Sequence, residues 1–457
     1  MIFRNIFRFF TFADYPKQVK FIMWNEAAER YAFYGMRAIL VIYVSQYLKI
    51  TDNIASAMFN YFNAFAYLTP ILGAYIADKY LGKFKIIVIF SLIYAAGFLT
   101  LAFSTTFSGL IVALFLIGLG TGGIKPCIST FMGDQLDCNA PNYDNLRAKA
   151  FGMFYFMINF GSIISTFLTP ITRELFGPRV AFSIPAILML LSLVIFLMGR
   201  KHYIHVSCNK EDHPPVFGVI IAAFKNFTNR IKGETILSGA LTKYSKQEVY
   251  GTYNLLQIVK IFAFMVIFYA VWDQQGSSWV IQAINMDGKF LGVSIPPDIM
   301  QVFNPLFILL LVPIFNKYVY PYVNNIIKLT PLRKIGTGIT LSGIAFISLG
   351  IFQQFLDAGI KINILWQVVT YFIMTCAEVL VIITAMEFAY SQAPKSMKSI
   401  IMSLFWLTVF LGDLLAGIML QVNIFKGASF FYFWAILAIV IGFLFIPVSK
   451  TYKHKEI

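Results

Sequence analysis

The chain has 457 residues, of which 59% are hydrophobic, 17% aromatic and only 12% charged, and its formal net charge is +15. Because about a quarter of the residues in soluble domains are charged, this composition excludes an ordinary soluble protein. In a soluble chain the positive charge would suggest nucleic-acid binding, but here it follows the sidedness of membrane proteins, and we expect no nucleic-acid partner.

Twelve apolar segments are long enough to cross a bilayer, at about twenty residues each. They lie at about 19–48, 56–78, 84–106, 108–132, 148–170, 179–199, 256–284, 299–326, 333–356, 362–391, 397–421 and 427–448. The polar, basic stretch between the two sets of six predicts a cytoplasmic linker with one or two amphipathic helices. We therefore expect an all-α polytopic membrane protein with two six-helix bundles (residues 1–199 and 254–457), a linker (200–253) and a midplane cavity between the bundles.

Most of the 36 lysines and arginines fall in the termini and loops of one side of these spans. The positive-inside rule makes that side cytoplasmic, and both termini lie on it. The basic, amphipathic start lacks a small-residue cleavage site, so no removable signal peptide is evident. The four cysteines show neither paired nor metal-binding spacing, which predicts free thiols and no metal site. All four histidines fall in cytoplasmic segments, so proton chemistry inside the membrane must use carboxylates.

The first span, WNEAAERYAFYGMRAILVIYVSQY, contains Glu26, Glu29, Arg30 and Arg37. At 100° per residue, positions 26, 30 and 37 share one helix face. An ionised group at the centre of a bilayer costs roughly 2.5–3.5 kcal/mol on insertion scales, so these groups must pair, face the bundle interior or line water. Alternatively, Glu26 lies at the helix entrance and reaches the interface, but Arg37 is three turns deeper.

The second span ends in GAYIADKYLGKFK, which places Asp78 among lysines at its cytoplasmic end. A carboxylate there can accept N–H groups from the start of another helix, and we expect it to hold the cytoplasmic side closed. Alternatively, this is a plain basic loop with one acid. The pattern resembles the loop between the second and third spans of the major facilitator superfamily.

The fourth span contains the glycine run GLGTGGIKP, and Lys125 stands just before its proline. Glycines allow helices to pack closely, and a lone lysine at this depth needs a counter-ion. Glu26, Glu29 and Glu378 can each supply it. The alternative is a lysine that reaches the cytoplasmic interface.

Later spans carry further polar groups. Asn159 lies in FYFMINFGS, where an amide must find a hydrogen-bond partner. Asp273 in VWDQQGSSWVIQA is a possible partner for Arg37, and Gln301, Asn304 and Pro305 in QVFNP form a second polar break. Glu378 stands alone in its span and needs Lys125, a ligand or a proton.

Together these segments resemble the proton-dependent oligopeptide transporter (POT/PTR) family of the major facilitator superfamily. EAAERYAFYG resembles its first-helix motif and FYFMINFGS its fifth-helix signature, while GTGGIKPCIS, DQQGSSW and EFAYSQAP resemble segments of its members. The match covers nearly all spans. It departs from the family at Asn60, where animal members carry histidine, and at Asp273, one residue before the seventh-helix glutamate of many bacterial members.

The resemblance implies roles for individual residues. The proton-coupling set is Glu26, Glu29, Arg30 and Lys125, with Asp273 if it fills the glutamate's role. The substrate-binding set is Tyr34, Arg37, Tyr67, Lys125, Asn159, Trp279, Asn304 and Glu378. Within this set Arg37 is implied to hold the peptide carboxylate and Glu378 the amino group.

The sequence and the resemblance lead to one hypothesis: a proton-coupled symporter of the cell membrane that imports di- and tripeptides by alternating access. We expect a monomer without cofactors other than the coupling proton. Ion pairs between the bundles, Arg37–Asp273 and Lys125–Glu378, would form and break in turn. The alternative is a facilitator for another small solute such as nitrate or a drug-like compound. An enzyme is disfavoured, because the sequence shows no metal-ligand cluster, nucleophile–base pair or phosphate loop.

Overall fold

The computed structural model describes residues 15–136, 143–204, 216–226, 235–392 and 397–452. Two of the four cysteines, Cys138 and Cys208, and three histidines, His205, His213 and His454, lie outside these ranges. The two described cysteines, Cys127 and Cys376, are free thiols.

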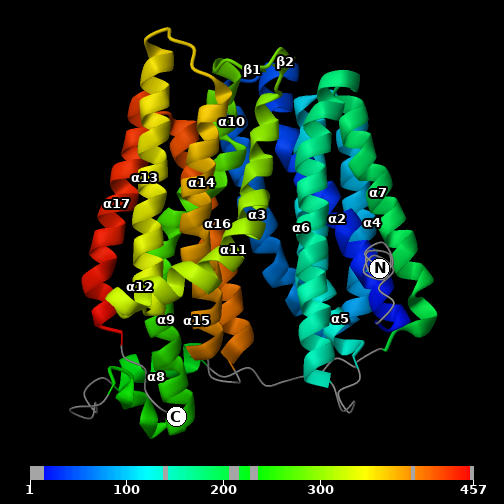
Figure 1. Cartoon of the computed structure of the whole chain (residues 1–457). Coiled ribbons are helices and arrows are strands. Elements are labelled where there is room, and N and C mark those ends of the chain that lie inside the picture. The colour runs from blue at the N-terminus through cyan, green and yellow to red at the C-terminus, as the bar shows by residue number, and fades with distance from the viewer. Residues whose placement is uncertain (1–14, 137–142, 205–215, 227–234, 393–396, 453–457) are drawn as a thin grey trace.

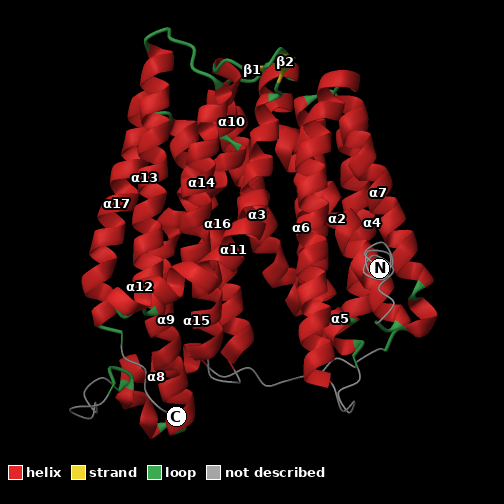
Figure 2. Cartoon of the chain, viewed as in Figure 1, coloured by secondary structure: helices red, strands yellow, loops and turns green. Residues whose placement is uncertain are grey.

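Nearly all of the described chain is helical, and the long helices run side by side (Figures 1 and 2). The N-terminal half contains α2 (Lys17–Ile42), α3 (Asp52–Ile76), α4 (Lys83–Phe103), α5 (Phe107–Asp134), α6 (Tyr143–Phe176) and α7 (Pro178–Met198). The C-terminal half contains α9 (Lys246–Trp272), α10 (Ser278–Asn285), α11 (Phe303–Ile314), α12 (Tyr320–Ile326), α13 (Pro331–Asp357), α14 (Gln367–Glu378), α15 (Thr384–Gln392), α16 (Lys398–Val422) and α17 (Ala428–Lys450). A short 3₁₀ turn joins α9 to α10, and π-helical stretches join α11 to α12 and α14 to α15, so each of these pairs forms one long segment.

Ten helical segments of the described chain are long and apolar enough to cross a membrane. The remaining two long helices, α2 and α3, have 26 and 25 residues and contain more polar side chains. At 1.5 Å per residue each is longer than the hydrocarbon core is thick. The predicted all-α polytopic fold is therefore confirmed, and the chain is a multi-pass membrane protein.

Two large hydrophobic clusters form the interior. One is built from α2 to α7, and the other from α9 to α17 together with Ala57 and Tyr67 of α3. Helix α3 packs against α5 on one side and α16 on the other, so it joins the two halves.

The glycine run of α5 sets how closely α3 approaches. A Cβ added at Gly73 would lie 2.1 Å from the carbonyl oxygen of Gly122, and one added at Gly122 would lie 2.5 Å from the Cβ of Thr69. The Thr69 hydroxyl donates to the carbonyl oxygen of Gly118 at 2.7 Å. Only residues without a side chain allow this backbone contact, as the glycine run predicted.

The two ends of the molecule differ. The antiparallel hairpin of β1 (Lys289–Phe290) and β2 (Val293–Ser294) marks one, here named the hairpin end. At the other, the linker end, α8 (Val216–Lys225) packs on the start of α9 (Figure 1). Phe217, Ile221 and Phe224 of α8 are exposed, so its outer face is apolar.

Helix α9 begins inside the range predicted for the linker. A capping box starts it: the Ser245 hydroxyl accepts from the Glu248 N–H at 3.3 Å, and the Glu248 carboxylate accepts from the Ser245 N–H at 2.9 Å. This local hydrogen bonding extends the helix beyond its apolar part, which hydropathy alone does not register.

Candidate functional site

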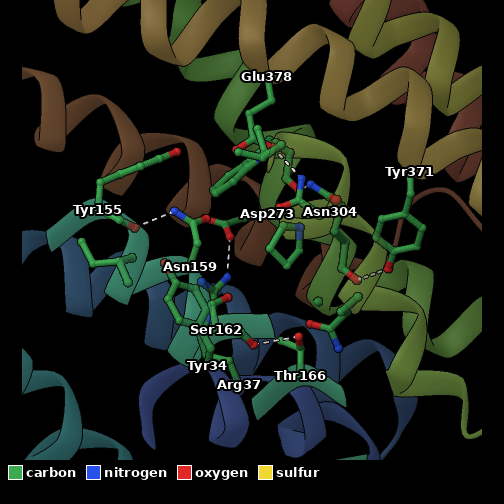
Figure 3. A pocket seen from close by; sticks show the side chains of 17 residues that line it. Tyr34, Arg37, Tyr155, Asn159, Ser162, Thr166, Asp273, Asn304, Tyr371 and Glu378 are labelled. Carbon is green, nitrogen blue, oxygen red and sulfur yellow. Dashed lines mark hydrogen bonds and ion pairs between the residues drawn. The ribbon is translucent and has the colours of Figure 1, made fainter. Parts of the chain in front are cut away.

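A cavity of about 210 Å³ lies between the two halves (Figure 3). Side chains from α2 and α6 line one side, and side chains from α11, α14 and the turn after α9 line the other. Its main polar residues are Tyr34, Arg37, Tyr155, Asn159, Ser162, Thr166, Asp273, Gln275, Gln301, Asn304, Tyr371 and Glu378. Five of the eight residues predicted to bind substrate are in the lining: Tyr34, Arg37, Asn159, Asn304 and Glu378.

Arg37 and Asp273 form an ion pair across the cavity wall, as the sequence predicted. The Arg37 Nη2 donates to Asp273 Oδ1 at 2.5 Å, and both side chains are almost fully buried. The guanidinium also lies over the rings of Phe33, Tyr34 and Phe59, at 5.6, 5.9 and 5.1 Å from their centroids. The pair therefore joins α2 to the C-terminal half in an aromatic surrounding.

Glu378 is held within the C-terminal half. Its carboxylate accepts from the Trp272 indole N–H at 2.8 Å and from the Asn304 amide at 2.6 Å. It ends the regular part of α14, and a π-helical stretch, Val379–Ile383, follows. Such π-helical insertions are frequent at functional sites, and this one lies directly beside the cavity.

The expected Lys125–Glu378 ion pair is not formed in this conformation. Lys125 Nζ instead lies 4.1 Å from the ring centroid of Phe33 and 4.6 Å from that of Tyr67. Tyr67 in turn stacks on Trp406 of α16, with centroids 5.5 Å apart. Lys125 and Tyr67 are therefore not in the cavity lining, because the lysine packs on this aromatic stack. Glu378 is hydrogen-bonded instead by Trp272 and Asn304 of its own half.

The tryptophan expected in the cavity is in the core. Trp279 is fully buried and packs edge-on against Tyr371 and Phe346, with centroids 4.9 and 5.9 Å away. Trp272, which sequence reasoning passed over, lines the cavity instead. The 3₁₀ turn Asp273–Gly276 and the non-helical Ser277 interrupt the helix between the two tryptophans, so helical periodicity cannot predict which face Trp279 takes.

The Glu26–Glu29–Arg30 cluster lies inside the N-terminal half. Arg30 Nε is 3.0 Å from Glu26 Oε1, and another nitrogen of its guanidinium pairs with Glu29. All three side chains are buried, so Glu26 is not at an interface. The cluster is formed by neighbours on one helix and does not line the cavity.

Further polar contacts join the two halves on the hairpin side of the cavity. Arg173 and Asp298 form a buried bidentate pair, with Nε–Oδ2 and Nη2–Oδ1 distances of 3.0 and 3.1 Å. Asn60 donates to the Ser277 hydroxyl at 3.0 Å, and Tyr61 donates to Gln421 at 2.5 Å. The protein is thus closed at its hairpin end.

Asp78, the predicted gating residue, lies at the linker end in the π-helical stretch Ala77–Leu81 that follows α3. It is exposed, and it has no hydrogen bond or ion pair within the described ranges. Its neighbour Lys83 pairs instead with Asp134 at 2.6 Å. The contact expected to close this end is absent from the present conformation.

Sequence reasoning also missed Asp413. It lies on α16 and is fully buried. The signal was present, because it is a lone carboxylate in an apolar span, as Glu378 is. No group of acids, histidines or cysteines able to hold a metal ion occurs in the described part of the chain.

Comparison with known proteins gives a consistent result. The model of the POT family matches residues 84–426. The chain is 40% identical over 369 residues to Peptide transporter family 1 of Drosophila melanogaster, covering 76% of this chain and 48% of that protein. It is 35% identical over 384 residues to human Solute carrier family 15 member 1, covering 77% and 54%. The chain spans about half the length of these curated relatives.

Solved structures match over nearly their whole length. The structure of the POT family transporter PepTSo superposes with a TM-score of 0.89 at 34% identity, covering 97% of this chain and 99% of that one. An auto-inhibited POT family peptide transporter superposes with a TM-score of 0.86 at 31% identity, covering 96% and 98%.

Proposed function

This chain belongs to the POT family, and on that premise we propose that it is a proton-coupled symporter that imports di- and tripeptides by alternating access. It catalyses no chemical reaction and uses no cofactor other than the coupling proton. It works as a monomer in the cell membrane. Relatives named as peptide transporters support the substrate class.

The observation that carries this proposal is the charge arrangement of the cavity. Arg37 of α2 and Glu378 of α14 line it from opposite halves. A short peptide carries a carboxylate at one end and an ammonium group at the other, so it complements this pair. Tyr34, Asn159 and Asn304 supply hydrogen-bonding groups between them.

Arg37 has two alternative partners in this scheme. When the hairpin end is closed, Asp273 holds it. When that end opens, the Arg37–Asp273 and Arg173–Asp298 pairs separate, and the peptide carboxylate replaces Asp273 on Arg37. Substrate binding and opening of the hairpin end thus use the same guanidinium.

The Glu26–Glu29–Arg30 cluster binds a coupling proton. A proton on either glutamate weakens the ion pair of that glutamate with Arg30. It also changes the electric field at Lys125 of α5, which lies over Phe33 of α2, the helix that carries the cluster. A proton that enters with the membrane potential supplies about 2.3 kcal/mol per 100 mV.

We assign residues 1–199 and 254–457 to two bundles that move relative to each other, with 200–253 as their linker. The lysine and arginine distribution puts the linker end and both termini in the cytoplasm. Asp78 closes that end in the opposite conformation, when it reaches the start of another helix.

Uptake of labelled dialanine into proteoliposomes tests the function. An inward acid gradient should drive accumulation, and a proton ionophore should abolish it. Unlabelled dipeptides should compete while free amino acids and nitrate do not. If nitrate or a drug-like compound competes and dipeptides fail, the alternative facilitator function replaces this one.

A further inference from the structure

Asp413 is a buried acid to which neither the sequence nor the proposed cycle gives a partner. Its side chain is 0% exposed, and neither carboxylate oxygen has a hydrogen-bond donor within reach in the described chain. An ionised carboxylate in such a position is strongly disfavoured. The group must therefore carry a proton or face a cation.

Close packing of α16 on α9 determines what Asp413 faces. A Cβ added at the preceding Gly412 would lie 2.7 Å from the Cβ of Tyr269 and 2.8 Å from the backbone nitrogen of Ala270. This contact brings α16 to the end of α9, where Asp273 follows. The carboxyl group of Asp413 faces that of Asp273 within hydrogen-bonding reach when one of them is protonated.

Arg37 is the one cation of the described chain that forms an ion pair with this carboxyl pair. Arg37 donates to Oδ1 of Asp273, while Oδ2 of Asp273 has no donor in the described chain. The charged and titratable groups that face Asp413 are Asp273 and Tyr269 from α9 and its turn, Arg37 from α2, Tyr67 from α3 and Lys125 from α5. Glu387 of α15 lies instead beside Tyr320 and Lys334.

Lys125 lies over the rings of Phe33 and Tyr67 and forms no ion pair with either carboxyl group in the described chain, so its charge acts on them only from a greater distance. Two carboxylates that share a buried site repel each other, so one of them keeps its proton. Oδ2 of Asp273 has no donor in the described chain, so it is free to accept that proton.

We propose that Asp413 is a second proton-binding site of this chain, which shares its proton with Asp273 and so controls the Arg37–Asp273 pair between the two halves. This inference rests on the proposed proton-coupled function. With the proton on Asp413, Asp273 carries the only negative charge of the pair and Arg37 balances it. Without the proton, Asp413 is an anion that no described donor reaches, and the closed hairpin end is disfavoured relative to an open, hydrated one. Proton binding at Asp413 thus favours closure of the hairpin end.

The test is the pH dependence of closure in the full chain, without peptide. Spin labels at Thr105→Cys and Lys361→Cys, in a background without native cysteines, report the distance between the halves at the hairpin end. In this background the closed fraction should fall as the pH rises. Tenfold tighter proton binding to the closed form changes the closed-to-open ratio up to tenfold.

In Asp413→Asn the hairpin end should stay closed as the pH rises, because the amide resembles the protonated acid. Asp413→Glu should retain a pH-dependent closure. The matched control is Asp52→Asn at the exposed start of α3, which makes the same chemical change outside the cluster and should titrate like the parent.

Infrared spectroscopy of the unlabelled protein gives a second readout. The carbonyl band of a protonated carboxyl group should be lost in Asp413→Asn. It should also be lost in Asp273→Asn, because Asp413 then faces Arg37 without a second acid and ionises. It should be kept in Asp52→Asn. A parent-like pH profile and an unchanged band in Asp413→Asn would overturn the inference. If the parent protein fails to couple dipeptide uptake to protons, the proposed function fails instead, while the spectroscopic result for Asp413 stands by itself.

Discussion

Two buried ionic clusters on α2 differ in what holds them. Glu26, Glu29 and Arg30 are neighbours on one helix, so their pairing survives any movement of the two halves. Arg37 pairs with Asp273 of the other half, and this pair must break when the halves separate. The first cluster can therefore stay paired in every arrangement of the two halves, whereas the second is present only when the halves meet here. The proposed proton coupling uses both kinds of cluster.

The largest effect should come from the cluster within α2. Glu26→Gln and Glu29→Gln should each abolish proton-driven accumulation of labelled dialanine, since an amide cannot bind and release the coupling proton. Exchange of peptide across the membrane should partly survive when the pH is equal on both sides. Proteoliposome uptake and counterflow separate the two, and unchanged accumulation would remove this cluster from the coupling mechanism.

The Arg173–Asp298 pair tests whether ion pairs between the two halves hold the hairpin end closed. Arg173→Gln leaves Asp298 buried without its partner, and breaking such a pair costs about 3–5 kcal/mol. The closed hairpin end should therefore lose population, measured as faster labelling of a cysteine introduced at the hairpin end. The double variant Arg173→Gln, Asp298→Asn removes both charges and should recover much of the closed population; if it is as open as the single variant, the pair is not what closes this end.

A smaller effect should follow from Glu378→Gln. Glu378 lines the cavity but belongs to neither of the two ionic clusters. Loss of a charge-assisted hydrogen bond to the peptide ammonium should weaken dialanine binding by about 1.5–3 kcal/mol, or roughly 10–100-fold. N-acetylated dialanine lacks the ammonium group, so any residual binding of it should be nearly unaffected. An equal loss for both peptides would argue that Glu378 supports the fold and does not contact the amino group.

The smallest effect separates the two tryptophans. Trp279→Phe should lower thermal stability slightly and leave KM for dialanine unchanged, because Trp279 lies in the core. Trp272→Phe removes a donor to Glu378 and should change KM more than stability. Parallel thermal unfolding and uptake assays distinguish these outcomes, and the reverse pattern would restore Trp279 as a substrate contact.

Much of the architecture could be predicted from sequence because membrane insertion depends on local hydrophobicity. The positions of the spans, the charged face of α2 and the close packing at the α5 glycines follow from residues near one another in the chain. The Arg37–Asp273 pair was predictable for a related reason: a buried arginine requires an acid, and few acids lie in the spans.

For the other buried groups, only the tertiary structure decided which of them meet. It put Lys125 on aromatic rings instead of Glu378, exchanged Trp272 for Trp279 at the cavity, and set Asp413 against Asp273. These outcomes depend on how helices from distant parts of the chain rotate and approach one another. The hydropathy of the sequence predicts that a polar group inside a membrane needs a partner. Side-chain packing between helices determines which group that partner is.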